Sequence, residues 1–268
     1  KKMKLYISAD IEGVTGIADW EETNKNKAKY KYFAEQMTKE VKAACEAANE
    51  VGVNEIVVKD AHGSGRNIDP SQLPINTKVI RGWSRHPYMM VQDIDSSFDA
   101  VAFIGYHSSG GSNTNPLAHT MSSSTVDYVK LNGELASEFL LYANAAAYEK
   151  VPTAFISGDK GICDDAKKLN NNIKTAAVLE GKGSSTISIH PEKSIQLIKK
   201  GIKESLKGDL SKNKIELADN FTLEIKYNYH GDAYHNSFFP GVKQKSAKVI
   251  ELKTDDYFEI MRATSFLL

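Results

Sequence analysis

Three short apolar segments in the first half of the chain constrain its fold more than any other feature. They are residues 3–9 (MKLYISA), 54–59 (NEIVVK) and 100–105 (AVAFIG). Their apolar residues follow one another without strict alternation, which is typical of strands buried on both faces of a parallel sheet. Between the first two, residues 24–51 carry apolar side chains at helical spacing and are followed by Gly52, a common helix stop. The chain therefore begins, by prediction, with a strand–helix–strand unit.

The rest of the chain continues to alternate strands and helices. Asn132-Gly133 is a typical hairpin turn after a predicted strand at 125–131, and residues 134–148 are predicted to form a helix rich in Ala and Leu. Further predicted elements are strands at 77–81, 153–157, 175–178, 221–229 and 247–252, helices at 191–207 and 255–266, and a helical turn at 166–169. We expect an α/β fold with a mixed, largely parallel sheet flanked by helices, and a smaller C-terminal α+β portion.

Length and charge limit the classes of function. We expect residues 1–268 to form a single catalytic unit, which a loose charged stretch allows to be subdivided into a metal-site α/β core at 1–207 and a strand and helix module at 208–268. Lys+Arg and Asp+Glu both number 34, so a general nucleic-acid or anionic-membrane binder is not expected. Because no run of eighteen apolar residues occurs, no membrane span is predicted, and the expected location is the cytoplasm.

Carboxylates and imidazoles follow the predicted strands. Asp10 and Glu12 come after the first strand, His62 after the second, His107 after the third, and Glu134 after the hairpin turn. Ligands of open α/β sheets gather outside the carboxyl ends of the strands, so we expect these side chains to meet. Such an oxygen and nitrogen set suits zinc and is large enough for two ions that share one carboxylate. If they converge, the sequence predicts a metal-assisted hydrolase.

Each residue also has an ordinary explanation. Asp10 and Glu12 are two apart and face the same side of an extended chain, where they would be costly to bury without cations but harmless at the surface. A lone histidine is often structural, and Glu134 could simply favour the dipole of a predicted helix. His119, beyond a Ser/Gly/Asn loop at 108–115, is a candidate acid–base or oxyanion partner.

Two other functions use the same ligands. A dizinc phosphoesterase would need a cationic clamp, for which Lys59 and Arg66 are the candidates by position. A metal-dependent peptide-binding protein would keep the metal without turnover. Composition and spacing alone leave both open.

The ordered motifs resemble one known family. The opening segment SADIEGVTG (residues 8–16) resembles the start of the zinc-dependent D-aminopeptidases of the DppA type, and the resemblance extends over nearly the whole chain. The later matching motifs, in the same order, are Asp60-Ala61-His62, Gly105-Tyr106-His107, His119 and Gly133-Glu134. The resemblance implies an aminopeptidase that hydrolyses N-terminal, D-configured residues from short peptides or amides through a metal-activated water.

The resemblance also implies roles and partners. Two zinc ions per chain would be bridged by Asp10, and His119 would be catalytic. The remaining ligands implied are Glu12, His62, His107 and Glu134. The implied assembly is a homo-oligomeric ring, a decamer whose active sites face an inner chamber. The implied partner is a short peptide substrate.

Overall fold

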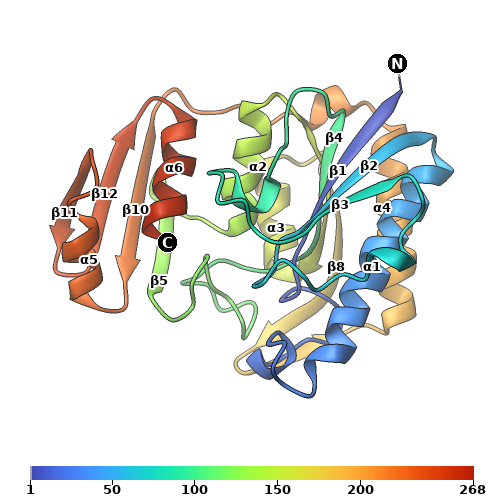
Figure 1. Cartoon of the computed structure of the whole chain (residues 1–268), viewed down its shortest axis with the longest axis horizontal. Helices are drawn as coiled ribbons and strands as arrows, with labels where there is room; N and C mark the ends of the chain where they lie inside the picture. The colour runs from blue at the N-terminus through green and yellow to red at the C-terminus, as the bar shows by residue number, and fades with distance from the viewer. Residues whose placement is uncertain (1) are drawn as a thin grey trace.

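A seven-stranded sheet forms the centre of the computed structural model, which describes residues 2–268 (Figure 1). Its strand order is β3-β2-β1-β4-β7-β8-β9, and every neighbouring pair is parallel except β8 with β9. The strands are β1 (Met3–Ala9), β2 (Val53–Asp60), β3 (Thr77–Ile80), β4 (Ala100–Tyr106), β7 (Thr153–Asp159), β8 (Lys174–Lys182) and β9 (Ser185–Ser188). The expected mixed, largely parallel sheet is confirmed.

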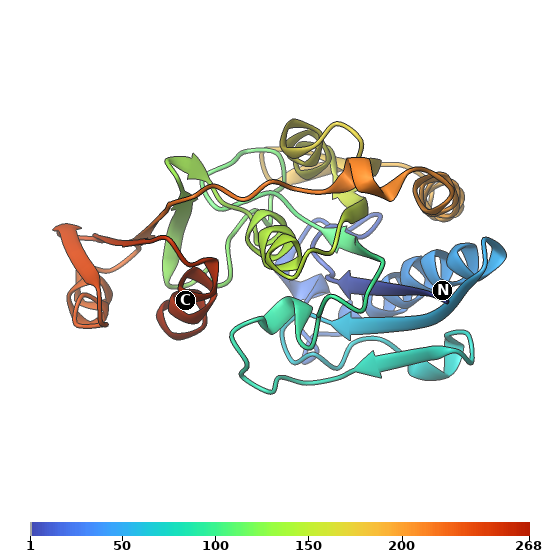
Figure 2. The same cartoon turned by 90° about the horizontal axis from the view of Figure 1, so that it is seen from above.

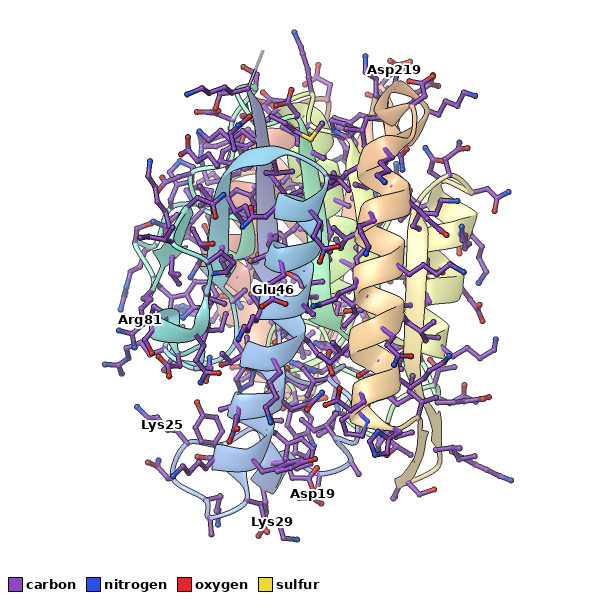
Figure 3. The ribbon with its side chains drawn as sticks, turned by 90° about the vertical axis from the view of Figure 1, so that its right-hand side faces the viewer. Asp19, Lys25, Lys29, Glu46, Arg81 and Asp219 are labelled. Carbon is purple, nitrogen blue, oxygen red and sulfur yellow. The ribbon has the colours of Figure 1, made fainter. Side chains whose placement is uncertain are left out.

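Helices cover both faces of this sheet. On one face α1 (Tyr30–Glu50) lies beside α4 (Pro191–Lys207), and Lys199 Nζ of α4 lies 2.7 Å from Glu46 Oε2 of α1 (Figure 3). On the other face lie α2 (Glu138–Tyr148) and α3 (Lys160–Leu169). Because side chains on both faces are buried, the apolar residues of β1, β4 and β7 follow one another in the sequence without strict alternation.

A second, antiparallel sheet stands beside the first, at the left of Figures 1 and 2. Its order is β11-β12-β10-β5-β6, and α6 packs against β10 and β12 on one side and against α2 on the other. Its elements are β5 (Val126–Leu131), β6 (Glu134–Leu135), β10 (Phe221–Tyr227), α5 (His230–Asn236), β11 (Val242–Ser246), β12 (Val249–Thr254) and α6 (Tyr257–Leu267). Since β5 pairs with β10, residues 208–268 do not form this sheet alone, and a boundary at 207 does not separate the two sheets.

The predicted helix at 134–148 begins four residues later than expected. Asn132 and Gly133 both have positive φ and form the hairpin turn, after which Glu134 and Leu135 pair with β5 as the return strand. Ser137 then caps the helix, because its side chain accepts a hydrogen bond from the backbone N–H of Leu140. Glu138, not Glu134, is therefore the acidic residue of the first helical turn.

The connections contain short 3-10 helices: η1 (Trp20–Glu22), η2 (Pro70–Gln72), η3 (Met89–Val91) and η4 (Leu210–Asn213). Across residues 2–268, none of the helices combines the length and apolarity needed to cross a membrane.

Candidate metal centre

Acidic and imidazole side chains form two adjacent groups at the carboxyl ends of β1, β2 and β4. The groups are Asp10, Glu12 and His62, and His107, His119 and Glu138, and within each the candidate ligand atoms lie within 4.8 Å of one another. Asp10 belongs to the first group and also lies close to the second. Its Oδ1 lies 3.3 Å from His62 Nδ1, and its Oδ2 lies 3.4 Å from His107 Nε2.

The separations between these atoms fit shared cations. Two ligand atoms bound tetrahedrally to one zinc ion at ordinary bond lengths lie roughly 3.3 to 3.6 Å apart. Here His107 Nε2 lies 3.3 Å from Glu138 Oε2, within this range, and His62 Nδ1 lies 3.1 Å from Glu12 Oε1, slightly below it. His119 Nε2 lies 3.5 Å from Glu138 Oε1. The side chains are thus spaced as neighbours around ions, with Asp10 placed to offer one oxygen to each.

Backbone carbonyls orient all three imidazoles. In each ring the nitrogen facing away from the cluster lies 2.9 Å from a carbonyl oxygen: that of Thr23 for His62, of Ser108 for His107, and of Leu117 for His119. A carbonyl oxygen can only accept a hydrogen bond, so this ring nitrogen carries the proton when the imidazole is neutral. The other nitrogen then presents its lone pair to the carboxylates, as in metal-binding histidines.

Two buried atoms in the cluster lack hydrogen-bond partners, which supports the fit to a cation. They are His107 Nε2 and Glu12 Oε2. Burial opposes the charge on Asp10, but His107 and His62 outweigh it and hold its pKa well below the usual value. Burial likewise lowers the pKa of His62, yet Glu12 and Asp10 raise it well above the usual value, and Glu138 and Asp10 do the same for His107. The buried carboxylates are therefore stabilised by nearby positive charge, which either protons on the imidazoles or metal ions can supply.

Glycines let the loops after β1 and β4 approach closely enough to form this cluster. A Cβ on Gly13 would lie 1.8 Å from the carbonyl oxygen of Tyr106, and one on Gly105, which has φ +71°, would lie 2.3 Å from that of Asp10. The N–H of Gly13 donates to the carbonyl of Gly105 at 2.9 Å. The close approach that brings Asp10 beside His107 thus depends on missing side chains.

Asp159, at the end of β7, holds the loop that follows His107. Its carboxylate accepts hydrogen bonds from the backbone N–H of Ser108 at 2.7 Å and from the Asn115 side chain at 3.1 Å. Asn115 also donates to the carbonyl of Glu12 at 3.0 Å. This network joins the β1, β4 and β7 ends, and the sequence alone did not reveal it because its members are distant along the chain.

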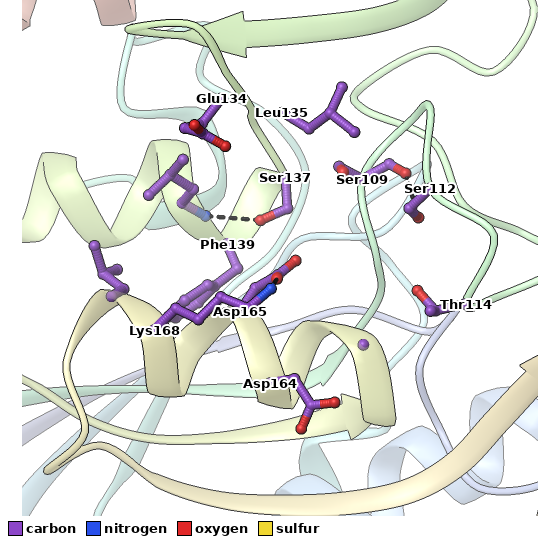
Figure 4. Close-up of a pocket in the computed structure, with 13 residues that line it drawn as sticks. Ser109, Ser112, Thr114, Glu134, Leu135, Ser137, Phe139, Asp164, Asp165 and Lys168 are labelled. Carbon is purple, nitrogen blue, oxygen red and sulfur yellow. Dashed lines mark hydrogen bonds and ion pairs between the residues drawn. The ribbon is translucent and has the colours of Figure 1, made fainter.

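Glu134 does not lie in the cluster, which corrects its expected place among the ligands. It is exposed on β6 and lines a different cavity of about 640 Å³, together with residues of α3 such as Asp165 and Lys168 (Figure 4). Glu138 occupies the expected position: it is buried, contacts His107 and His119 through its carboxylate, and accepts the backbone N–H of Met121 at 2.7 Å. The helix-capping serine just before it was the available sequence signal.

Lys59 and Arg66, the candidates for a phosphate clamp, do not belong to either ligand group. Lys59 Nζ donates to the carbonyls of Asp60 and Gly82, both at 2.7 Å, and lies 3.9 Å from the Trp83 ring centroid. Burial lowers the pKa of Lys59 to about 8. Arg66 is exposed. Neither arrangement favours a phosphoesterase.

Comparison with known proteins decides the family. A family model described as D-aminopeptidase matches residues 3–266. The chain belongs to the D-aminopeptidase family. It is 27% identical over 263 residues to a D-aminopeptidase of Bacillus subtilis, covering 97% of this chain and 95% of that protein.

A solved structure agrees with this assignment. The Zn-dependent D-aminopeptidase DppA from Bacillus subtilis, described as a self-compartmentalizing protease, matches with a TM-score of 0.91 and 27% identity. The match covers 99% of this chain and 96% of that one. The family resemblance is confirmed, and so is the α/β fold expected from the order of strands and helices. The chain is a peptidase of this family, and the phosphoesterase and peptide-binding alternatives are not favoured.

Proposed function

We propose that this chain is a zinc-dependent aminopeptidase that removes D-configured N-terminal residues from short peptides or amides. The observation that carries the proposal is the pair of ligand groups joined by Asp10, whose nitrogen and oxygen atoms are separated by the distances expected around shared zinc ions. The zinc dependence of the DppA structure supports the identity of the metal.

The donor set suggests how two ions would be held. Asp10, Glu12 and His62 would hold one, and Asp10, His107 and Glu138 the other. A bound zinc pair would lower the pKa of a water molecule and polarise the carbonyl of the bond to be cleaved. The carboxylates of the site also give the free amino group of a substrate an ionic partner.

His119 is the residue proposed to act on the reacting groups. Its side chain is 11% exposed and lines a cavity of about 350 Å³ together with Asp10, Glu12, His62 and Glu138, whereas the side chain of His107 is fully buried. The two rings are stacked with centroids 4.3 Å apart, and Trp20 lies edge-on to His119 at 5.2 Å. With Nδ1 held by the carbonyl of Leu117, His119 is oriented to move a proton or stabilise the developing oxyanion through Nε2.

We further propose that residues 1–268 act as one catalytic unit that assembles into a decameric ring. Glu138 lies three residues after Leu135, the last residue of the hairpin strand β6, so a short segment connects the second sheet to the metal cluster. Exposed aromatic side chains near the C-terminus, including Tyr234, Phe238 and Phe266, offer apolar surface for self-association. Native mass spectrometry should count ten chains per particle; a monomer at micromolar concentration would contradict the ring.

Hydrolysis of D-alanine amide tests the proposed reaction. We expect release of free D-alanine that a chelator abolishes and added zinc restores, with L-alanine amide as the stereochemical control. A protein that binds zinc tightly but turns over no peptide, amide or phosphoester would contradict the proposal. Equal rates on the two alanine amides would contradict the D preference alone.

A further inference from the structure

Apolar side chains line the cavity that contains the metal cluster. The whole cavity measures about 350 Å³ and is lined by members of both ligand groups and by Trp83, Met89, Met90 and Met121. Within residues 2–268, every ionisable side chain that lines this cavity belongs to one of the two ligand groups. A substrate bound through its amino group and scissile carbonyl at the metals would therefore place its first side chain against apolar walls.

Two of these methionines are held in unusual backbone conformations. Met89 and Met121 have φ of 33° and 65°, in the left-handed region that side-chain-bearing residues seldom adopt. They come from segments far apart in the sequence, yet the hydroxyl of buried Tyr142 lies 3.5 Å from the sulfur of Met89 and 3.7 Å from that of Met121. Backbone strain of this kind persists where the surrounding structure enforces it, often at ligand-binding sites.

Trp83 is fixed just as firmly. Its indole N–H donates to the carbonyl of Gly63 at 2.8 Å, and the Lys59 ammonium lies over its ring. The N–H of Gly82 donates to the carbonyl of Gly65 at 2.8 Å, which ties this loop to the one that follows His62. The indole is thus a rigid wall, whereas the methionine thioethers that line the same cavity are flexible and polarisable and can adapt to side chains of different shape.

We propose that Trp83, Met89 and Met121 form the surface that selects the side chain of the substrate's N-terminal residue, and that they favour aliphatic side chains of leucine or methionine size. Alanine would leave part of this apolar surface uncovered. Aspartate would bring a further carboxylate next to those of the cluster, where no lysine or arginine side chain of residues 2–268 lines the cavity. The inference rests on the proposed aminopeptidase function, since it takes the metal cluster as the place where the scissile bond lies.

Amides of D-leucine, D-alanine and D-aspartate test this surface. With the zinc-loaded protein, kcat/KM should be about tenfold or more higher for the leucine amide than for the alanine amide, and lower still for the aspartate amide. Met121→Ala and Met89→Ala should each reduce the leucine-to-alanine ratio at least about fivefold, mainly through KM. Met121→Leu, which conserves side-chain volume, should keep the leucine-to-alanine ratio of the unmodified protein. Met3→Ala should keep it as well, because Met3 begins β1 and the metal cluster lies beyond the other end of that strand.

Calorimetry separates failure of this inference from failure of the proposed function. Binding of D-leucine amide and D-aspartate amide is measured with and without zinc, in the unmodified protein and in Met121→Ala. Zinc-dependent hydrolysis with equal rates on all three amides, or ratios untouched by both alanine variants, would overturn the selecting surface and leave the aminopeptidase standing. If no amide is hydrolysed, the binding data still decide the question. Tighter binding of D-leucine amide than of D-aspartate amide, weakened by Met121→Ala, supports the selecting surface, whereas equal binding of the two amides overturns it.

Discussion

Replacing Glu138 by Gln tests the assignment that the structure changed. Glu138 Oε2 lies 3.3 Å from His107 Nε2, and its Oε1 lies 3.5 Å from His119 Nε2 and accepts the N–H of Met121 at 2.7 Å. An amide oxygen can keep the hydrogen bond to Met121, so the variant removes charge while preserving the fold. Glu134→Gln is the matched control, because that carboxylate is exposed on β6.

The expected loss is large and specific to one ion. Removing an outer partner of a metal ligand costs about 10- to 100-fold in affinity, so losing a direct anionic ligand should cost at least about 100-fold, or about 2.7 kcal/mol. Zinc content measured by elemental analysis after dialysis should fall from about two ions per chain to about one. Activity should fall with it, while Glu134→Gln should keep both.

The metal-free protein offers an independent measurement. Burial lowers the pKa of His107, and among the groups that raise it Glu138 contributes most. Glu138→Gln should therefore lower the pKa of His107, as followed by the NMR titration of its imidazole. A Glu138→Gln protein with full zinc content and affinity, beside a Glu134→Gln protein that has lost an ion, would refute the reasoning.

Three further predictions concern the same region. His119→Ala should retain its zinc but lose about 10²- to 10⁴-fold in kcat, and an unchanged rate would remove His119 from the chemistry. In the metal-free protein the pKa values of His62 and His107 are raised, so their contribution to stability is complete below about pH 6.5 and is lost as pH rises through those pKa values. The zinc-loaded protein should instead gain stability as pH rises, because protons no longer compete with zinc for the imidazoles. Melting temperatures measured against pH, once with chelator and once with zinc, should therefore give curves that cross. Ser137→Ala should cost about 1 kcal/mol in urea unfolding by removing the cap of α2, and a loss below about 0.3 kcal/mol would mean that the cap is not stabilising.

Several elements could be predicted because their signals are local. The helix at 191–207 was predicted with the bounds that the structure gives, since Pro191 and the spacing of its apolar residues mark it. Asp10, His62 and His107 were predicted to converge because each follows a strand of one parallel sheet, whose carboxyl ends share an edge.

Glu138 could not be found in the same way. Which acid enters the cluster depends on how many residues the hairpin uses before the helix begins, and that number is set by pairing of β6 with β5. A shift of four residues along the chain moves the carboxylate from an exposed strand to a buried helical turn. The pairing of β5 with β10 likewise joins residues about ninety positions apart, which placed residues 126–135 in the second sheet.

The sequence by itself determined the parallel sheet, the edge at which ligands gather and the family, because burial on both faces and ordered motifs leave marks that are readable along the chain. Only the tertiary structure decided that Glu138 completes the cluster and that Met89, Met121 and Trp83 stand together beside it. Those contacts join segments whose separation in sequence carries no periodic signal, so they become visible only once the chain has folded.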